Sequence, residues 1–209
     1  MTHPLHPAEL REFFGDIDIY LFDQLLRGRI EAHATVLDAG CGAGRNVVFM
    51  MRAGMNVFGI DASTDAIAAV QRQAMAVAPD LPSAQFSVQS LDAMSFAAST
   101  MDVVVSSAVL HFSRDEAHFG ACVREMWRVL APGGLFFCRL ASTIGIERET
   151  RLLGGRHHLL PDGTTRFLVD APFLMDTTSA LGGVLLDPLK TTVVQGMRAM
   201  TTWVLRKEQ

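Results

Sequence analysis

The chain has 209 residues, of which 49% are hydrophobic and 19% are charged, and this composition suits one compact domain with a sizeable core. Its formal net charge of −4 provides no overall attraction to nucleic acid or to an anionic membrane, which disfavours both as partners. No apolar run approaches the roughly 20 residues that a membrane span requires, so we expect no membrane partner. The modest acidic balance and the lack of a recognisable nucleic-acid module favour a small-molecule partner.

Apolar runs and helical patterns alternate from residue 8 to residue 140. The segment 8–30 has apolar side chains three and four residues apart, broken near Gly15-Asp16, which predicts helical structure. Short apolar runs predict five strands, at residues 35–38, 56–60, 85–88, 101–106 and 135–140. Helical patterns lie between them, at residues 45–53, from Ser63 or Thr64 to about 76, and at 115–130. This alternation predicts βαβ units and a parallel sheet covered on both faces.

The pattern changes after residue 140. We expect an irregular stretch from 141 to 165, with a turn at 161–163, and then a helix from 170 to 181. Two extended segments follow, at 184–189 and 197–205, with no room for a crossover helix, so they should pair antiparallel at a sheet edge. The expected fold class is therefore α/β, a Rossmann-like three-layer α-β-α sandwich. Its mostly parallel seven-stranded sheet would end in a C-terminal antiparallel hairpin.

A glycine-rich loop, Asp38–Gly44 (Asp-Ala-Gly-Cys-Gly-Ala-Gly), follows the first predicted strand. Three of its residues lack a Cβ atom, so the backbone can turn sharply and a ligand can lie against it. In an open α/β sheet such loops lie at the carboxyl edge, where ligands bind. A tight strand-to-helix turn that holds no ligand explains the glycines equally well when they are considered alone.

Two further carboxylates follow the next two strands. Asp61 ends the second strand, 17 residues beyond Gly44, where a carboxylate can accept hydrogen bonds from both hydroxyls of a ribose. Asp92 lies just past the third strand, where it can accept a hydrogen bond from an adenine amino group. Either residue alone is more often a loop or helix-capping carboxylate. Together with the glycine loop, at the ends of successive strands, they predict an adenosine pocket.

Four segments carry a resemblance to a known family, in the same order along the chain. Residues 36–46 and 59–61 resemble the first and second motifs of class I S-adenosylmethionine-dependent methyltransferases, especially the small bacterial ones. Residues 102–112 resemble the motif of the fourth strand, and residues 127–134 the helix and turn before the fifth. The likeness covers about half of the chain. It implies S-adenosyl-L-methionine as the cofactor and S-adenosyl-L-homocysteine as the product.

The resemblance also implies which residues hold the cofactor. Asp38 and the glycine loop would contact its methionine end, and Asp61 would bind the ribose. Residues 90–92 would surround the adenine, while the backbone of Ser107 would lie near the sulfonium. The complete expected set is Tyr20, Asp38, Gly40, Cys41, Gly42, Gly44, Asn46, Asp61, Ala62, Ser90, Leu91, Asp92 and Ser107.

The expected single domain, residues 1–209, divides into four parts on the same basis. The N-terminal helices resemble the lid of the family, in which Tyr20 would either close over the cofactor or pack as a half-buried aromatic. The parts are a helical lid at 1–30, a cofactor-binding core at 34–140, a substrate-side insertion and helix at 141–182, and a terminal hairpin at 183–209.

Two residues near the expected acceptor position are candidates for catalysis. His111 follows the fourth strand, where families of this type often carry a histidine, either as a base or only as a structural residue. Arg139 interrupts an apolar strand, so it either binds an anion in the site or pairs with a buried acid. His157, His158 and Arg166, in the irregular segment, are substrate contacts or ordinary loop residues, and we expect no metal site.

Methyl transfer to an unidentified small molecule is the leading hypothesis, because the fold does not choose among oxygen, nitrogen, carbon, sulfur and metalloid acceptors. The alternative is a non-catalytic S-adenosylmethionine-binding regulator or sensor. A nicotinamide-dependent oxidoreductase is disfavoured because the loop lacks the GxGxxG spacing. The single tyrosine, Tyr20, also belongs to no Tyr-x-x-x-Lys pair.

The start of the chain lacks both the basic and the apolar segment of a signal peptide. The three cysteines, Cys41, Cys122 and Cys138, are isolated and form no CxxC pair, which favours reduced thiols and a cytoplasmic location. Apolar residues in the last predicted strands leave both a monomer and a homodimer open.

Overall fold

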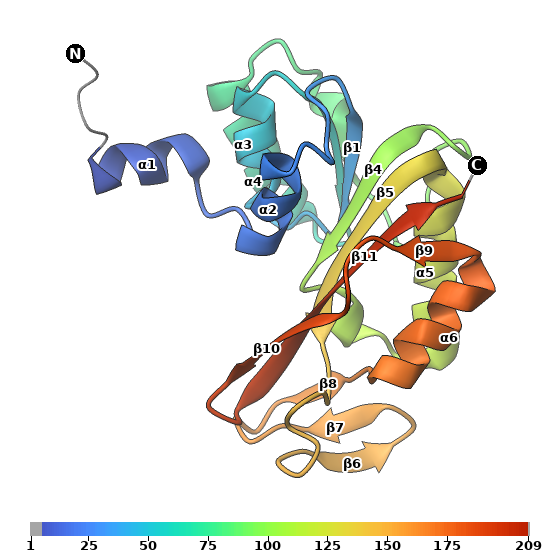
Figure 1. The fold of residues 1–209 in the computed structure, drawn as a ribbon. Coiled ribbons are helices and arrows are strands. Elements are labelled where there is room, and N and C mark those ends of the chain that lie inside the picture. The colour runs from blue at the N-terminus through green and yellow to red at the C-terminus, as the bar shows by residue number, and fades with distance from the viewer. Residues whose placement is uncertain (1–5, 209) are drawn as a thin grey trace.

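The computed structural model describes residues 6–208 and has one large sheet at its centre (Figure 1). Its strands are β1 (Thr35–Ala39), β2 (Asn56–Asp61), β3 (Phe86–Val88), β4 (Met101–Ser107), β5 (Leu130–Ala141), β9 (Gly183–Leu185), β10 (Lys190–Val194) and β11 (Arg198–Lys207). They are arranged in the order β10-β11-β5-β4-β1-β2-β3, with β9 also paired to β11. The first five are parallel to one another, whereas β11 is antiparallel to β5.

Within residues 6–208, six α-helices accompany the sheet. They are α1 (Pro7–Phe14), α2 (Ile19–Leu26), α3 (Val47–Arg52), α4 (Thr64–Val77), α5 (Glu116–Val129) and α6 (Ala171–Leu181), with short 3₁₀ helices at Ser83–Gln85 and Leu110–Phe112. Capping side chains explain several starts: Ser63 accepts from the backbone of α4, Asp115 from that of α5, and Asp170 from that of α6. The predicted break near Gly15-Asp16 separates α1 from α2, as expected.

Alternate residues of the central strands face opposite layers. Val103 and Val105 of β4 lie in the cluster that contains buried residues of α3 and α4, whereas Val104 lies in the cluster with α5 and α6. Phe136 and Phe137 of β5 divide in the same way. Because side chains alternate along a strand, a sheet whose consecutive residues are all buried must be covered on both faces. The predicted three-layer α/β architecture is confirmed.

The prediction of an irregular stretch from 141 to 165 is wrong. This region contains a second, antiparallel sheet made of β6 (Arg151–Gly154), β7 (His157–Leu159) and β8 (Thr165–Phe167), in that order. All four residues of β6 are exposed, so no alternation of apolar and polar residues marks it in the sequence. The predicted turn at 161–163 joins β7 to β8, with the Gly163 N–H donating to the carbonyl of Leu160 at 2.9 Å.

The predicted C-terminal antiparallel pairing is confirmed, but the first predicted segment, 184–189, is a strand only as far as Leu185, and β10 lies beyond it. Both β9 and β10 pair with β11, at Leu205–Lys207 and at Arg198–Thr202 respectively. They share one edge position, so the sheet has eight strands in the seven positions expected. Residues 186–189, between β9 and β10, contain Pro188, which cannot donate a ladder hydrogen bond. No helix within residues 6–208 is long and apolar enough to cross a membrane.

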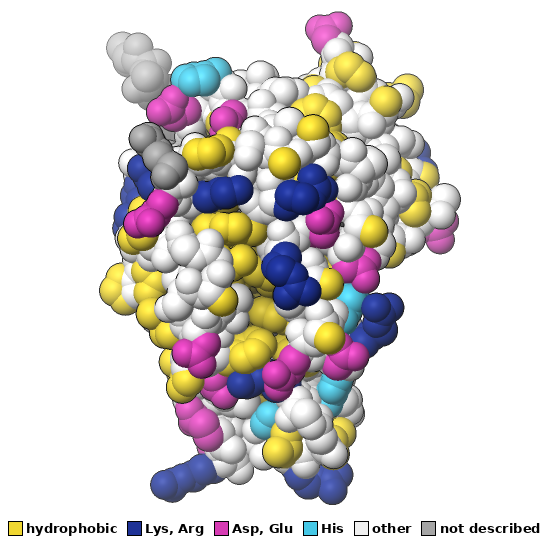
Figure 2. Space-filling view, turned by 90° about the vertical axis from the view of Figure 1, so that its right-hand side faces the viewer, with side chains coloured by type: hydrophobic (Ala, Val, Ile, Leu, Met, Phe, Trp, Pro, Cys, Tyr) yellow, Lys and Arg dark blue, Asp and Glu magenta, His cyan; other side chains and the backbone are white. Residues whose placement is uncertain are grey.

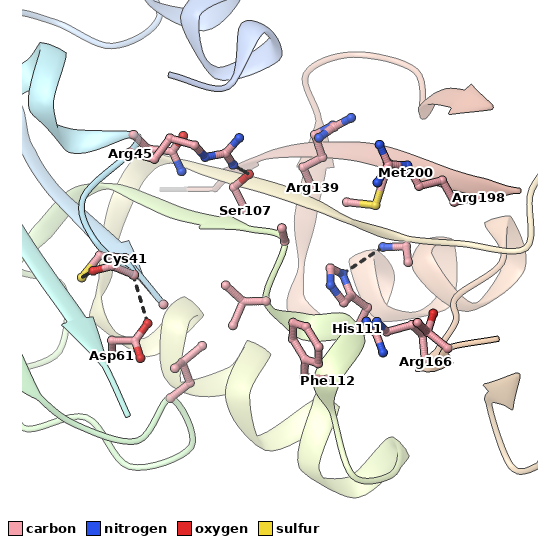
Figure 3. Close-up of a pocket in the computed structure, with 18 of the residues that line it drawn as sticks. Cys41, Arg45, Asp61, Ser107, His111, Phe112, Arg139, Arg166, Arg198 and Met200 are labelled. Carbon is pink, nitrogen blue, oxygen red and sulfur yellow. Dashed lines mark hydrogen bonds between the residues drawn. The ribbon is translucent and has the colours of Figure 1, made fainter. Parts of the chain in front are cut away.

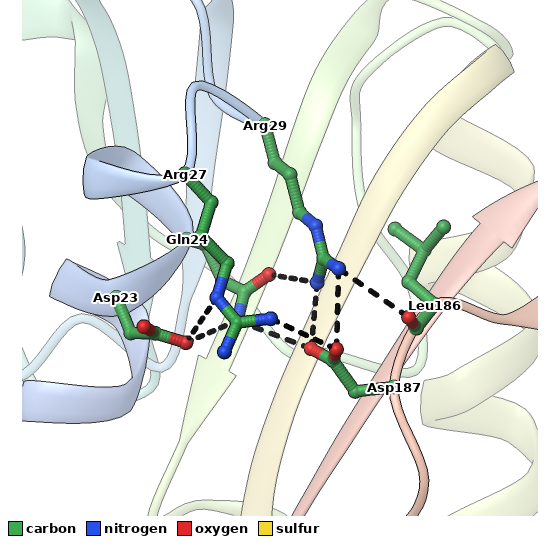
Figure 4. A network of polar contacts seen from close by, with 6 residues as sticks. All are labelled: Asp23, Gln24, Arg27, Arg29, Leu186 and Asp187. Atoms are coloured by element: carbon green, nitrogen blue, oxygen red, sulfur yellow. Dashed lines mark hydrogen bonds and ion pairs between the residues drawn. The ribbon is translucent and has the colours of Figure 1, made fainter.

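A polar cluster ties α2 to the connection between β9 and β10 (Figure 4). Asp187 accepts hydrogen bonds from Arg29 at 2.6 and 3.1 Å and from Arg27 at 3.1 Å. Gln24 accepts a further bond from Arg29 at 2.8 Å. The hydrogen bonds from Arg29 hold the pKa of Asp187 below its ordinary range. The end of α2 is therefore fixed to the last strands of the sheet.

Candidate functional site

A cavity of about 880 Å³ lies at the carboxyl ends of β1, β2, β4 and β5. The strand register explains its position, because Asp38 pairs with Val105 and Ser107 with Arg139, which brings the ends of these strands level. Figure 3 shows Cys41 and Asp61 at one end, and Arg166, Arg198 and Met200 at the other. The volume of the cavity lies within the range of pockets that hold small organic ligands.

Ten of the expected residues line this cavity. Gly44 instead packs beside Val70 of α4, and Asp38 is fully buried beneath the glycine loop. The residues that line it are Gly40, Cys41, Gly42, Asn46, Asp61, Ala62, Leu91, Ser107, His111 and Arg139. Five expected residues lie outside this lining: Tyr20, Asp38, Gly44, Ser90 and Asp92.

Two glycines of the loop have different roles. Gly40 has a φ of 87°, and a Cβ atom there would lie only 2.5 Å from Val109 Cγ2, so close packing requires this glycine. Gly42 has a φ of 53°, but among the described residues no atom lies within 4 Å of where its Cβ would be. The loop therefore leaves open space beside Gly42, on the cavity side, which a ligand can fill.

Asp61 is held in place by the backbone at the end of β2. Its Oδ2 accepts a hydrogen bond from the N–H of Gly42 at 3.0 Å, and its Oδ1 accepts one from the N–H of Ser63 at 2.9 Å. Each carboxylate oxygen has a second lone pair, and the side chain lines the cavity. A fixed carboxylate of this kind can accept from two neighbouring hydroxyl groups, as a ribose presents them.

Asp38 is an unusual carboxyl group. It is 0% exposed, and neither of its oxygens has a hydrogen-bond partner among the described residues. Burial raises its pKa to about 7, because the charged form loses its hydration. A buried, unpartnered carboxyl under the glycine loop fits a ligand that brings a positive charge to this loop. The side chain of Asn46 offsets part of this rise in pKa, and its Oδ1 accepts a hydrogen bond from the backbone N–H of Asp18 at 3.1 Å.

Asp92 is directed toward α5. It accepts a hydrogen bond from the Ser90 hydroxyl and lies 3.6 Å from Arg114 and 3.7 Å from His118. The hydrogen bond from Ser90 lowers the pKa of Asp92. Leu91, between these two residues, is the member of the expected adenine segment that lines the cavity.

Arg139 pairs with a buried acid, which is one of its two expected roles. Its Nη1 lies 3.1 Å from Oδ2 of Asp18, whose side chain is 2% exposed, and the same oxygen accepts from the Ser107 hydroxyl at 3.3 Å. Arg45 lies 4.0 Å from this carboxylate and donates to Ser107 at 3.2 Å. Asp18 also caps α2 through the N–H of Tyr20 at 3.0 Å. One carboxylate thus serves both the helix start and the cavity wall.

Tyr20 is not among the residues that line the cavity, but it packs against Arg139 and bonds Thr192, which both line it. Its ring centroid is 5.3 Å from the Arg139 guanidinium, and its hydroxyl forms a 2.6 Å hydrogen bond with that of Thr192. Nothing near Asp18 in the sequence marks it as a site residue, because its partner Arg139 is 121 residues away. Arg45 directly follows the glycine loop and is a further cavity residue that the expected set lacks.

His111 is buried and held by the backbone. Its Nδ1 accepts a hydrogen bond from the N–H of Ala141 at 3.4 Å, so in the neutral ring the proton lies on Nε2. Burial, assisted by the positive charge of Arg166, lowers the pKa of His111 to about 4. The ring is therefore neutral at physiological pH, a weak base and a hydrogen-bond donor through Nε2.

The end of the cavity opposite Asp61 contains Arg166, which the sequence analysis named as a substrate contact or a loop residue, and Arg198 and Met200, which it did not name. Arg166 of β8 lies over the ring of Phe112, with 4.9 Å between its Cζ and the ring centroid. Arg198 and Met200 come from β11. These residues converge from segments that are far apart in sequence. No motif signals such convergence.

The two adjacent histidines are not in the cavity lining. His157 forms a hydrogen bond with the carbonyl of Ser113 at 3.2 Å, and His158 forms one with Thr150 at 3.2 Å. Within residues 6–208, no group of three or more His, Cys, Asp or Glu side chains is arranged to hold a metal ion. Both histidines thus find hydrogen-bond partners outside the residues that line this cavity.

Sequence comparison places the glycine loop and its strands in a known family. The profile described as "Methyltransferase domain" matches residues 37–138. The ubiquinone biosynthesis O-methyltransferase of Brucella anthropi is 29% identical over 161 residues, which are 75% of this chain and 62% of that protein. The chain therefore spans less than two thirds of the length of this relative.

Solved structures share the fold. A SAM-dependent methyltransferase of Methanosarcina mazei is similar with a TM-score of 0.71 and 19% identity, covering 88% of this chain and 97% of that one. Magnesium protoporphyrin IX methyltransferase of Synechocystis, solved with bound SAH, gives a TM-score of 0.70 at 16% identity and covers 100% of this chain and 90% of that one. At such identities the likeness establishes the fold, and the chemistry must be argued from the cavity.

Proposed function

Because this chain belongs to the class I S-adenosylmethionine-dependent methyltransferases, we propose that it transfers the methyl group of S-adenosylmethionine to a small-molecule acceptor. The observation that carries the proposal is a continuous cavity that joins the glycine loop and Asp61 to a separate, arginine-containing end. One end suits a nucleoside and the other leaves room for a second molecule. S-adenosylhomocysteine is the expected product.

The residues present fit the cofactor. We assign the ribose to Asp61, the adenine to the neighbourhood of Leu91, and the methionine end to the loop at Gly42 and to Arg45. Asp38, unpartnered beneath the loop, complements the positive charge that the cofactor carries. The cofactor supplies a methyl group that its sulfonium already activates.

The protein's own contribution is positioning. Transfer of an activated methyl group is an in-line displacement. The protein therefore accelerates the reaction by holding the two molecules in the correct relative orientation and by excluding water. His111 donates through Nε2 toward the cavity and orients an acceptor atom that has a free lone pair. The relative named an O-methyltransferase supports oxygen as that atom.

We further propose that the protein acts on free small molecules in the cytoplasm. The three cysteines are buried and unpaired within the described residues, which suits a reducing compartment. Basic and acidic side chains are interspersed on the face that Figure 2 shows, which favours a small acceptor over a long polyanion. Sedimentation would decide between a monomer and a homodimer.

Two measurements test the proposal together. Calorimetry should detect binding of S-adenosylmethionine but not of NAD. Mass spectrometry should detect S-adenosylhomocysteine when a panel of phenols, carboxylates, thiols and amines is supplied. Cofactor binding without release of product from any acceptor would instead favour a non-catalytic regulator or sensor, and binding of NAD alone would refute the family-based assignment.

A further inference from the structure

Four arginines line the cavity, and they differ in their partners. Arg139 is paired with Asp18 at 3.1 Å, and Arg45 lies 4.0 Å from the same carboxylate. Arg166 and Arg198 have no carboxylate within ion-pair distance among residues 6–208. The two arginines without such a partner lie together at the end of the cavity opposite Asp61 (Figure 3).

Arg166 is held against the cavity wall. It is half-buried, its Cζ lies 4.9 Å from the centroid of the Phe112 ring, and its Nη1 donates to the carbonyl of Thr165 at 2.8 Å. A guanidinium has five N–H donors, so most of its donors remain for a ligand. Its charge reaches the cavity, because it contributes to the low pKa of His111.

Arg198 reaches the same place from another element. It is the first residue of β11, pairs with Val194 of β10, and is exposed at the cavity mouth. Its position and that of Arg166 allow two guanidinium groups to approach one anion from different sides. Each guanidinium presents a planar fork of N–H donors that can bind both oxygens of a carboxylate, which makes arginine the common partner of carboxylates.

Asp162 sets the net charge of this end. It lies in the turn before β8 and accepts from the N–H and hydroxyl of Thr164 at 2.9 and 2.6 Å. The bond from the Thr164 hydroxyl, with smaller contributions from the charges of Arg166 and Arg198, lowers the pKa of Asp162. Two guanidinium groups and one carboxylate leave a single positive charge, which suits a monoanion better than a phosphate dianion.

Apolar side chains surround these charges. Phe112, Leu160 and Met200 line the same end, and Phe112 is 62% exposed although it lies at the cavity. We propose that Arg166 and Arg198 bind the carboxylate of an acidic acceptor whose apolar body lies against these three side chains. This inference rests on the proposed methyl transfer and defines the chemical class of its acceptor.

The test uses three probes that share a naphthalene ring and differ in the polar group attached to it. Calorimetry on the full chain saturated with S-adenosylhomocysteine would compare naphthalene-2-carboxylate, naphthalene-2-carboxamide and 2-naphthyl phosphate. The carboxylate should bind about 10-fold more tightly than the uncharged amide, because a charge-assisted hydrogen bond is worth roughly 1.5 kcal/mol or more. The phosphate should bind more weakly than the carboxylate.

Variants then assign this preference to the arginines. Arg166→Gln should weaken the carboxylate about 10-fold and Arg198→Gln, which is more exposed, about 5-fold, with the amide unchanged. Arg124→Gln, a change at an exposed arginine outside the cavity lining, is the matched control. If Arg166→Gln does not fold, Arg198→Gln alone carries the test.

Several results would overturn the inference. These are equal binding of carboxylate and amide, no binding of the carboxylate, tighter binding of the phosphate, or a carboxylate affinity that neither arginine variant changes. S-adenosylhomocysteine binding should be the same in both variants and in the control. If the unaltered protein does not bind S-adenosylhomocysteine, the proposed function is refuted. Failure of the proposed function can therefore be told apart from failure of the carboxylate inference.

Discussion

Replacing Asp38 with asparagine should stabilise the cofactor-free protein at high pH. The carboxyl group is fully buried and without a hydrogen-bond partner in the described structure, so its charged form is costly in the folded state. Asparagine has nearly the same shape as the protonated acid and carries no charge. The variant therefore removes the ionisation and little else.

The magnitude follows from the pKa of Asp38, which burial raises from 3.8 to about 7. Between these two values the folded state binds more protons than the unfolded state, so the free energy of unfolding falls as the pH rises. Three pKa units correspond to about 4 kcal/mol, an upper bound that is reached above pH 7. From pH 5 to pH 8 the change amounts to about 2–3 kcal/mol.

His111 acts in the opposite direction. Burial lowers its pKa from 6.5 to about 4, so the unfolded state binds more protons between these values, and stability rises with pH in that window. Both the unaltered protein and Asp38→Asn retain this histidine, so it cancels in the difference between them. Only the carboxyl contribution of Asp38 remains.

Urea denaturation at pH 5 and pH 8 would measure this difference. The free energy of unfolding of Asp38→Asn minus that of the unaltered protein should increase by about 2–3 kcal/mol between the two pH values. Asp80→Asn, a change at an exposed carboxylate, serves as the control and should leave the difference constant. A constant difference for Asp38→Asn as well would refute the reasoning.

Three other perturbations test the site. Asp61→Ala should weaken binding of S-adenosylmethionine by about 10- to 150-fold in calorimetry, and an unchanged dissociation constant would mean that the ribose lies elsewhere. Asp18→Asn retains a capping side chain for α2 but leaves the Arg139 guanidinium unpaired. It should lower the free energy of unfolding by about 2–3 kcal/mol, whereas unaltered urea denaturation would contradict a stabilising ion pair. The pH profile of kcat should show no ionisation of His111 between pH 6 and 8; a limb there that is absent from His111→Gln would identify the ring as a base.

Local patterns were sufficient to predict the parallel strands between residues 35 and 140 and the helices between them. Each strand from β1 to β5 is marked by a short apolar run, and Asp61 and the glycine loop lie at strand ends that a parallel sheet must bring together. The helix-capping residue Ser63 was likewise predictable, because capping depends on neighbours in sequence.

The acceptor half depends on contacts between distant segments. Arg139 was predicted as a site residue because it is a cation in an apolar strand. Its partner Asp18 precedes α2, and nothing nearby in the sequence identifies Asp18 as that partner. The exposed strand β6 has no periodic pattern, so the second sheet was missed, and with it the placement of Arg166 beside Arg198. Tertiary contacts alone assemble this end.

The two anchor points of α2 couple the N-terminal helices to the cavity. Asp187 holds the end of the helix, and the Asp18 carboxylate caps its start through Oδ1 while its Oδ2 faces Arg139. Thermodynamic linkage makes such a shared group reciprocal. We expect that a molecule that draws the Arg139 guanidinium away from Asp18 weakens the hold on the start of α2, and that an ordered α2 disfavours that molecule by the same free energy.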